Sequence, residues 1–367
     1  MSLKVQKMAE IDAAPPNTLL SFCSSLKDDK WHDQPGAKAF ESWHFDAVSD
    51  DGREALVIVF YDNYVLSPRY FENHNFEVEA NGGIDVSKSR FPAISFAYSV
   101  DGKTVISSIS EYGSDAFSSS PRDGKCALGK SSFQVEAAEY GSGFVIRIDI
   151  GTFRKRSIVA ELEWLFVESD LMPRNGDSSR STWNMVAPRS DVSGRISLIG
   201  RRGKIRKVIH FRGTGYHDHI CYPGPVTGGR LWGRAHFVDT TVIFETSSNA
   251  VGVPSKLFMV RDGAIHERNV TCDATEIKRD RYGLKIPRRI SFISGDSIRL
   301  RVKPMSTIRS CFSEVKMLSE ITLMLRDGNP RKTLGITEFV DAGRMKNRFL
   351  RRLTDLRIGR GGRSPLF

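Results

Sequence analysis

Short segments that alternate apolar with polar residues, or that are apolar throughout, follow one another along most of the chain. Residues 42–48 alternate, a Ser-Asp-Asp-Gly turn follows, and residues 55–61 are almost entirely apolar. Alternation with a period of two is typical of half-buried strands, and a short apolar run between turn residues is typical of a buried strand. Similar segments occupy residues 93–100, 104–111, 143–150 and 157–167. We therefore expect consecutive antiparallel strand pairs.

The second half of the chain continues this pattern after an interruption. Residues 168–190 contain proline, Asn-Gly and Ser-Ser and predict a polar loop around Trp183. Strands are then expected at residues 194–199, 204–211, 241–244, 256–260, 288–293, 297–302 and 321–325. Helical spacing of apolar residues is confined to residues 308–319 and the C-terminal tail.

These elements predict an all-β protein of two antiparallel β-barrels or sandwiches, with a short C-terminal helix. A length of 367 residues allows two cores. We expect a loosely ordered lead-in segment at residues 1–36, an N-terminal β-domain at residues 37–220 and a C-terminal β-barrel domain at residues 221–367.

The net charge of +11 is concentrated in the tail. Residues 344–363 hold eight Lys/Arg and one acid, and Met345, Phe349, Leu353 and Leu356 recur at helical spacing. We interpret the tail as an amphipathic helix that docks on a sheet and exposes a basic face to solvent. Binding of nucleic acid or of an anionic membrane is the alternative, and we expect neither partner.

Cysteine usage and the N-terminus indicate an intracellular, cytoplasmic protein. Five cysteines are widely spaced, without a close pair of the zinc-ribbon or redox kind, which predicts free thiols. The apolar patch at residues 18–23 is shorter than a membrane span or a secretory signal core. The pattern specifies no oligomeric state.

Polar and aromatic side chains of the kinds that bind ligands or catalyse reactions gather in residues 211–219 and 231–237. These two segments contain three of the eight histidines. Buried polar groups are costly unless they have partners, so this cluster is either a structural hydrogen-bond network or a site. On a strand, Tyr216 and Asp218 would share one face, and His217 and His219 the other.

A metal site formed by His217, His219 and His236 is conceivable, because two of the three have His-x-His spacing. No carboxylate or cysteine completes an obvious ligand shell. We therefore expect no metal, and interpret His217 and His219 mainly as structural.

Two common enzyme classes find no support in the sequence. The Gly-Gly pairs at residues 82, 228 and 361 lack the Lys-Ser/Thr of a phosphate-binding loop, and no strand-helix units surround them. A Gly-x-Ser-x-Gly nucleophile elbow is also missing from any strand-helix junction.

Several segments together resemble one known superfamily. They are the Trp-x-Phe-Asp-Ala-x-Ser-x-Asp-Gly sequence at residues 43–52, Gly-x-Gly-Tyr-His-Asp-His at residues 213–219 and Trp-Gly-Arg-x-His at residues 232–236. They resemble the hydroxyneurosporene synthase, or carotenoid hydratase, superfamily. Phe91-Pro92, Glu111-Tyr112 and residues 163–168 are most similar to the fungal intramolecular Diels-Alderases of polyketide pathways. The resemblance extends from about residue 40 to residue 355.

The resemblance implies two lipocalin-like β-domains and a largely apolar pocket in or beside the first domain, near the interface. It also implies a small-molecule polyene substrate from polyketide or polyketide-amino acid biosynthesis and a cofactor-free intramolecular [4+2] cycloaddition. Such a reaction requires that a flexible chain be held with diene against dienophile. It also benefits from a donor to the dienophile's carbonyl as charge develops there.

Candidate residues for these tasks follow the strands. Tyr61, Asn63 and Tyr64 would emerge at a barrel mouth, where a phenol could polarise a carbonyl, although aromatic packing would explain the tyrosines equally well. Glu111 is either a polar group of the pocket or a solvated strand end.

Other residues would line the pocket. Trp183 and Trp232 offer flat apolar walls for a polyene or simply belong to the core. His217 and His236 complete the expected substrate-binding set.

Three functions remain open at this point. The first is the cyclase. The second is a polyene or terpenoid hydratase or isomerase in which, by resemblance, Asp218 is the general acid and Tyr216 its neighbour. The third is a non-catalytic carrier of a hydrophobic ligand. Alternatively, Asp218 accepts hydrogen bonds from His236, Arg234 or the backbone and meets no substrate.

Overall fold

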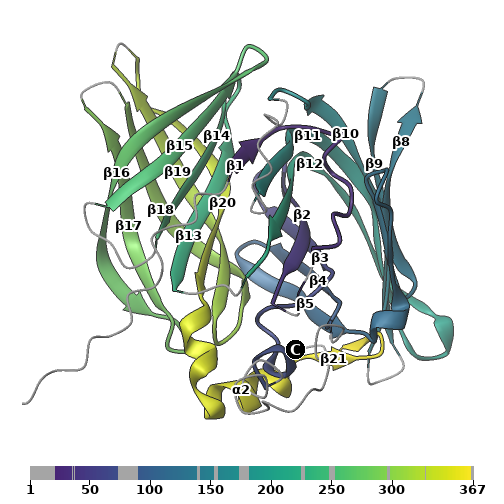
Figure 1. Cartoon of the computed structure of the whole chain (residues 1–367). Helices are drawn as coiled ribbons and strands as arrows, with labels where there is room; N and C mark the ends of the chain where they lie inside the picture. Colours follow the sequence, from purple (N-terminus) through teal and green to yellow (C-terminus); the bar gives the residue numbers. More distant parts are fainter. Residues whose placement is uncertain are drawn as a thin grey trace, which may run out of the picture.

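The computed structural model describes residues 21–34, 36, 38–72, 90–138, 141–152, 156–172, 182–224, 228–247, 253–295, 298–326 and 328–364. It contains two β bodies that lie side by side, with the helix α2 (Arg348–Asp355) beneath them (Figure 1). The predicted all-β, lipocalin-like fold class is confirmed. The glycine pair at residue 82 and the turn at residues 173–176 lie outside the described residues.

The first body is a 14-stranded sheet that curls around a core. Its strands up to residue 128 are β1 (Ser21–Cys23), β2 (Phe40–Ser49), β3 (Glu54–Tyr61), β4 (Ala93–Val100), β5 (Lys103–Glu111), β6 (Phe117–Ser119) and β7 (Lys125–Leu128). The others are β8 (Ser131–Ala138), β9 (Gly141–Thr152), β10 (Ser157–Glu168), β11 (Thr182–Ile199), β12 (Ile205–Tyr222), β21 (Gly359–Arg360) and β22 (Arg363–Ser364).

The C-terminal tail closes this sheet into a ring. β10 pairs with β11 and β9. At the other end of the sheet, β21 pairs with β5 and β22 pairs with β9, both in parallel. The last strands of the chain thus hydrogen-bond to the first body, although the sequence assigned their residues to the second domain. The predicted boundary at residue 220 itself stays a prediction, and β12 continues past it to Tyr222.

The second body is a closed antiparallel barrel of β13 to β20. Its strands are β13 (Gly229–His236), β14 (Thr241–Ser247), β15 (Val253–Arg261), β16 (Ala264–Arg279), β17 (Lys285–Ser294), β18 (Ile298–Ser310), β19 (Glu314–Leu325) and β20 (Arg331–Asp341). Leu231, Phe244, Leu257 and Phe292 belong to the apolar cluster that fills it.

The strand β3 shows how the two bodies pack. Leu56, Ile58 and Phe60 belong to the core of the first body. The alternate residues Ala55, Val57 and Val59 pack against the barrel residues Ile308, Leu318 and Ile336. Both faces of β3 are therefore buried, which explains its almost uninterrupted apolar sequence.

Two sequence predictions of secondary structure are wrong. Residues 308–319 form the end of β18, a turn and the start of β19, because register shifts near Ser306 and Arg309 interrupt the alternation and imitate helical spacing. Trp183 lies in β11 rather than in a loop, opposite Phe22 and Ile220.

The described part of the lead-in segment, residues 21–34 and 36, is more ordered than expected. Its strand β1 pairs with β11, and Cys23, Ser24 and Asp29 are buried. All five cysteines are buried and form no disulfide bond, which confirms the prediction of thiols.

The terminal helix is shorter than predicted, and its apolar residues face in different directions. A 3-10 helix (Ala342–Lys346) precedes α2 (Arg348–Asp355), and Asn347 caps α2 by accepting hydrogen bonds from the backbone of Phe349 and Leu350. Because the chain changes helix type at Asn347, the apolar residues do not share one face. Met345 is buried, whereas Phe349 and Leu356 are 67% and 72% exposed. Among the described residues no helix is both long and apolar enough to cross a membrane.

Candidate active site between the two bodies

The predicted alternation along β12 is correct. In register with β2, Tyr216 lies opposite Asp46 and Asp218 opposite His44, on the side that faces the barrel. His217 and His219 point to the other side, into the first body, where they stack on Phe45 and Trp43. The strand therefore contributes to two separate polar clusters.

Asp218 lies between two donors on the barrel-facing side. Its Oδ2 accepts hydrogen bonds from Trp183 Nε1 at 2.8 Å and from Tyr216 Oη at 2.9 Å. Burial raises the pKa of Asp218 to about 6, although the two donors act in the opposite direction. Its Oδ1 has no hydrogen-bond partner among the described residues. This carboxyl can hold or release a proton near neutral pH.

The donors to Asp218 differ from those expected. His236 and Arg234 were candidates, but the donors are Trp183 and Tyr216, so Trp183 acts through its indole N–H as well as its apolar ring. The guanidinium of Arg234 lies over the Tyr216 ring, 5.1 Å from its centre. Burial raises the pKa of Tyr216, which keeps its phenol a donor.

Arg234 carries a buried charge from the barrel into the interface. It forms an ion pair with Asp46 of β2, and its Nη2 lies 3.2 Å from His44 Nε2. All three side chains are almost completely buried. An arginine in such a position stays charged, so its pairing with Asp46 fixes the two bodies relative to each other.

Further ion pairs continue along the interface from β19. Lys316 Nζ forms an ion pair with Glu338 and lies 3.7 Å from Glu314 Oε1. Glu314 in turn accepts a hydrogen bond from Arg309 Nη1 at 3.1 Å, and Arg309 donates to Ser95 Oγ of the first body at 2.8 Å. We call the buried residues Asp46, Arg234, Arg309, Glu314, Lys316 and Glu338 the interface ion pairs.

A small cavity of about 20 Å3, partly open to solvent, lies where the interface ion pairs end at Arg309. The first body contributes Tyr64, Ser107 and Ile109, the barrel contributes Arg309, Ser310 and Cys311, and the tail contributes Thr354, Arg357 and Ile358. Burial raises the pKa of Tyr64, so its hydroxyl is neutral and can donate. Tyr64 and Arg309 thus place a neutral and a charged donor in one cavity.

The other residues predicted near a barrel mouth are more structural. Tyr61 is half-buried and its ring centre lies 5.0 Å from that of Tyr64. Asn63 is buried, donates to the Ala39 carbonyl at 2.9 Å and accepts from the Phe91 backbone. It therefore fixes the chain around Tyr64 and does not line the cavity.

Glu111 is neither solvated nor part of the cavity lining. Its Oε2 accepts a hydrogen bond from Arg360 Nη1 at 3.0 Å, next to the pairing of β5 with β21. Burial raises the pKa of Glu111, and the arginine partly opposes this effect. Glu111 anchors the tail strand that closes the first body.

Trp232 and His236 lie on β13 in different surroundings. Trp232 is half-buried and packs against the apolar cluster that includes Tyr64 and Ile358, beside the cavity. His236 contacts Thr241 Oγ1 at 3.1 Å, and burial lowers its pKa to about 3. Trp232 packs near residues of the cavity but does not line it, whereas His236 has a local structural partner.

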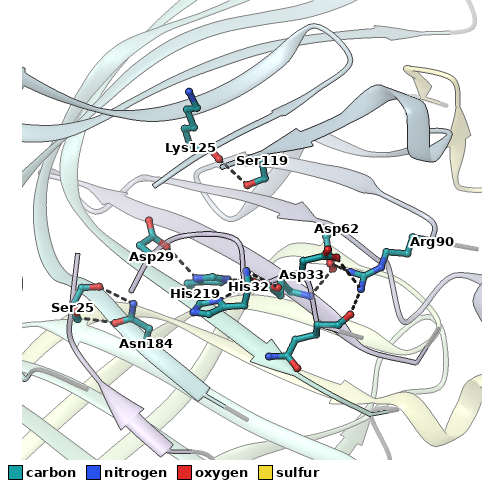
Figure 2. A network of polar contacts seen from close by, with 12 residues as sticks. Ser25, Asp29, His32, Asp33, Asp62, Arg90, Ser119, Lys125, Asn184 and His219 are labelled. Carbon is teal, nitrogen blue, oxygen red and sulfur yellow. Dashed lines mark hydrogen bonds and ion pairs between the residues drawn. The ribbon is translucent and has the colours of Figure 1, made fainter. Parts of the chain in front are cut away.

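The second polar cluster lies inside the first body (Figure 2). His219 Nε2 lies 3.0 Å from Glu41 Oε2, and its Nδ1 lies 3.3 Å from Asp29 Oδ1. His217 Nε2 lies 3.2 Å from Asp29 Oδ2. Burial alone would lower the pKa of His219, but hydrogen bonds to the two carboxylates raise it to about 9.

The structure does not bring together His217, His219 and His236, the three histidines that the sequence offered as an alternative metal site. Among the described residues, the group with metal-ligand spacing is His32, Glu41 and His219. His32 was assigned to the lead-in, and Glu41, now the second residue of β2, is a single carboxylate just before the strand expected at residues 42–48, so no short motif identified them. Arg309, Glu314 and Lys316 were likewise hidden in a segment expected to be helical.

The two curled β bodies define a lipocalin-like all-β protein. Its clusters of buried ionisable groups lie between the two bodies and inside the first one. No protein-family model matches the chain. It is 24% identical over 355 residues to a hydroxyneurosporene dehydrogenase of Chlorobaculum tepidum, an alignment that covers 91% of this chain and 90% of the relative.

Solved structures share the fold. A protein of Nitrosomonas europaea described as AttH matches 89% of this chain and 98% of its own, with a TM-score of 0.55 and 15% identity. CghA matches with coverages of 83% and 88%, a TM-score of 0.51 and 14% identity. Kievitone hydratase of Nectria haematococca matches with coverages of 88% and 98%, a TM-score of 0.51 and 9% identity.

Proposed function

We propose that this chain is a cofactor-free enzyme of the carotenoid hydratase-like lipocalin superfamily and that it catalyses an intramolecular [4+2] cycloaddition of a linear polyene. The substrate would be an intermediate of polyketide or polyketide-amino acid biosynthesis. The observation that carries the proposal is the placement of Tyr64 of the first body and Arg309 of the barrel at one small cavity, which a polyene would widen on entering.

These two donors fit the electronic demand of the reaction. A cycloaddition needs no proton transfer, but it is accelerated when hydrogen bonds withdraw electrons from the dienophile's carbonyl. Tyr64 supplies a neutral hydroxyl, and the guanidinium of Arg309 is held by Glu314 and Ser95. Ile109, Ile358 and the nearby Trp232 supply apolar surface against which a polyene could fold.

The comparisons support an enzyme that acts on a related class of compounds. The relative from Chlorobaculum tepidum is named for hydroxyneurosporene, and one protein with the same fold is a hydratase. The sequence resemblance to Diels-Alderases, in residues 91–92, 111–112 and 163–168, favours ring formation over addition of water.

Asp218 favours a second candidate function, the hydration or isomerisation of a polyene or terpenoid. A carboxyl with a pKa of about 6 can protonate a carbon-carbon double bond, and its free Oδ1 is the atom that would carry the proton. Trp183 and Tyr216 would hold the carboxyl in place through Oδ2.

Product analysis separates these functions. The purified full chain is incubated with linear polyenes that end in a conjugated ketone, and products are analysed by mass and by NMR. A new ring at unchanged mass supports the cyclase, a gain of one water supports the hydratase, and unaltered but bound ligand indicates a carrier.

Matched variants then assign the residues. For a cyclase, Tyr64→Phe should lower the rate by roughly 10- to 1,000-fold, as expected for loss of one donor to developing charge. Asp218→Asn should leave cyclisation within about twofold. Tyr98→Phe is the control, because Tyr98 belongs to the core of the first body rather than to the cavity. Equal rates for Tyr64→Phe and the wild type would refute the role of Tyr64.

A further inference from the structure

The polar cluster inside the first body brings three separate chain segments together. His32 comes from the N-terminal segment, Glu41 from β2 and His219 from β12. His32 Nδ1 lies 3.1 Å and His219 Nε2 lies 3.0 Å from Glu41 Oε2, and the three ligand atoms are within 4.8 Å of one another. In Figure 2, His32 and His219 lie side by side, with Asp29 on one side and the Asp62–Arg90 pair on the other.

These spacings match a metal-binding geometry. Zinc bonds to imidazole nitrogen and carboxylate oxygen are about 2.0–2.2 Å long, so neighbouring ligands of a tetrahedral ion lie roughly 3.3 Å apart. Two histidines and one glutamate are an established zinc ligand set, which leaves a fourth position for water. The side chain of His32 is 15% exposed, whereas those of Glu41 and His219 are buried, so His32 marks the side from which an ion can enter.

Metal-binding histidines generally donate their other ring N–H to an acceptor, and Asp29 is placed to be that acceptor for His219. If His219 binds a metal through Nε2, its Nδ1 must carry the proton, and Asp29 Oδ1 lies 3.3 Å from that nitrogen. The other oxygen of Asp29 contacts His217, whose Nδ1 donates to the His44 carbonyl at 3.0 Å. The ring of His219 is also fixed by stacking on Trp43.

Asp29 and Glu41 are two buried carboxylates, which favour a positive charge in this cluster. In the metal-free chain the protonated His219 supplies that charge. A divalent cation on Nε2 of His219 would take the place of the proton and balance the same carboxylates.

We propose that His32, Glu41 and His219 bind a divalent transition metal ion, with zinc the best match, and that Asp29 orients His219 for this purpose. The ion would join the N-terminal segment to β2 and β12. That segment runs from Ser24 to Gln34 without a strand of its own. Side-chain and backbone hydrogen bonds, such as those of Ser25 with Asn184, already fix it, and the ion would add a direct link to both strands. This structural site lies on the opposite face of β12 from Asp218 and is independent of the proposed cyclase chemistry.

Metal content and binding test the proposal. The full chain is stripped with a chelator, dialysed and titrated with Zn2+ by calorimetry, and the bound metal is counted by mass spectrometry. We expect one zinc per chain. His32→Ala and Glu41→Gln should each weaken binding by at least 100-fold, and Asp29→Asn by roughly 10- to 100-fold. His266→Ala is the matched control, because His266 is exposed on β16, and should bind like the wild type.

Two measurements on the wild type keep the test valid if a variant fails to fold. Zinc should raise the melting temperature of the stripped chain, and the increase should grow with the ratio of free zinc to its dissociation constant. Co2+ in the same site should give the intense visible absorption of a four- or five-coordinate ion without thiolate bands. Less than 0.1 zinc per chain, a six-coordinate cobalt spectrum, or unchanged zinc affinity in folded Glu41→Gln would overturn the proposal.

Discussion

Replacing Asp218 by asparagine tests whether burial raises the pKa of this carboxyl toward neutral pH. Its pKa rises from an ordinary value of 3.8 to about 6, and each pKa unit corresponds to about 1.4 kcal/mol. Keeping Asp218 ionised in the folded protein therefore costs about 3 kcal/mol. Trp183 and Tyr216 can still donate to the carbonyl oxygen of an asparagine, so the network on Oδ2 persists in the variant.

The sign of the pH dependence follows from the direction of this pKa change. Below about pH 3.8 Asp218 is protonated in both the folded and the unfolded chain and contributes no penalty. Between about pH 3.8 and 6 only the unfolded chain releases the proton readily, so the wild type loses stability. Above about pH 6 the penalty is complete. The variant lacks this group, so its stability relative to the wild type should rise by about 3 kcal/mol from pH 4 to pH 8.

Urea denaturation of both proteins at pH 4, 5, 6, 7 and 8 measures this difference. Asp262→Asn serves as the control, because Asp262 lies in an exposed turn where asparagine is readily accommodated. A difference in unfolding free energy between Asp218→Asn and the wild type that stays constant within about 0.5 kcal/mol would refute the assignment of Asp218 as a buried carboxyl with a raised pKa.

Four further outcomes are expected. Arg234→Met should lower the unfolding free energy by about 3–5 kcal/mol, because it leaves Asp46 buried and unpaired, and adding Asp46→Asn should restore much of the loss in urea denaturation. Gly215→Ala should cost about 1–3 kcal/mol by the same assay, since a Cβ would lie 2.9 Å from the Asp46 carbonyl oxygen, whereas Gly328→Ala meets nothing closer than 4.0 Å and should be neutral. Ending the chain at Ile358 removes β21 and β22 and should accelerate amide hydrogen exchange in β5 and β9 but leave the barrel strands unchanged. A thiol reagent should modify the cysteines of the native protein slowly, and all five rapidly in denaturant; a fast-reacting thiol in the native state would contradict their burial.

The candidate active site depends on the docking of the two bodies. Asp46 and Ser95 come from the first body, whereas their partners Arg234 and Arg309 come from the barrel. The cavity is likewise lined by both bodies and by the tail. We therefore expect that substitutions that loosen the interface reduce activity even where no substrate contact is lost.

Local sequence pattern was sufficient for many of the strands and for the two faces of β12, but it did not single out β6 to β8, β16 or β20. Alternation depends only on the period of two along an extended chain, so Tyr216 with Asp218, and His217 with His219, could be separated correctly. The same rule failed at residues 308–319, where register shifts between β18 and β19 changed the spacing of apolar residues. It also failed at the tail, where helix type changes at Asn347.

Only the tertiary structure decided which polar residues act together. The partners of Asp218 and His219 lie between 2 and 190 positions away, and in the proposed metal site His219 lies 178 positions from Glu41. The local sequence specifies the chemistry of a side chain and the face of the strand on which it lies. Its partners are set by how the ring closes and how the barrel docks, because buried charges require neighbours that distant strands provide.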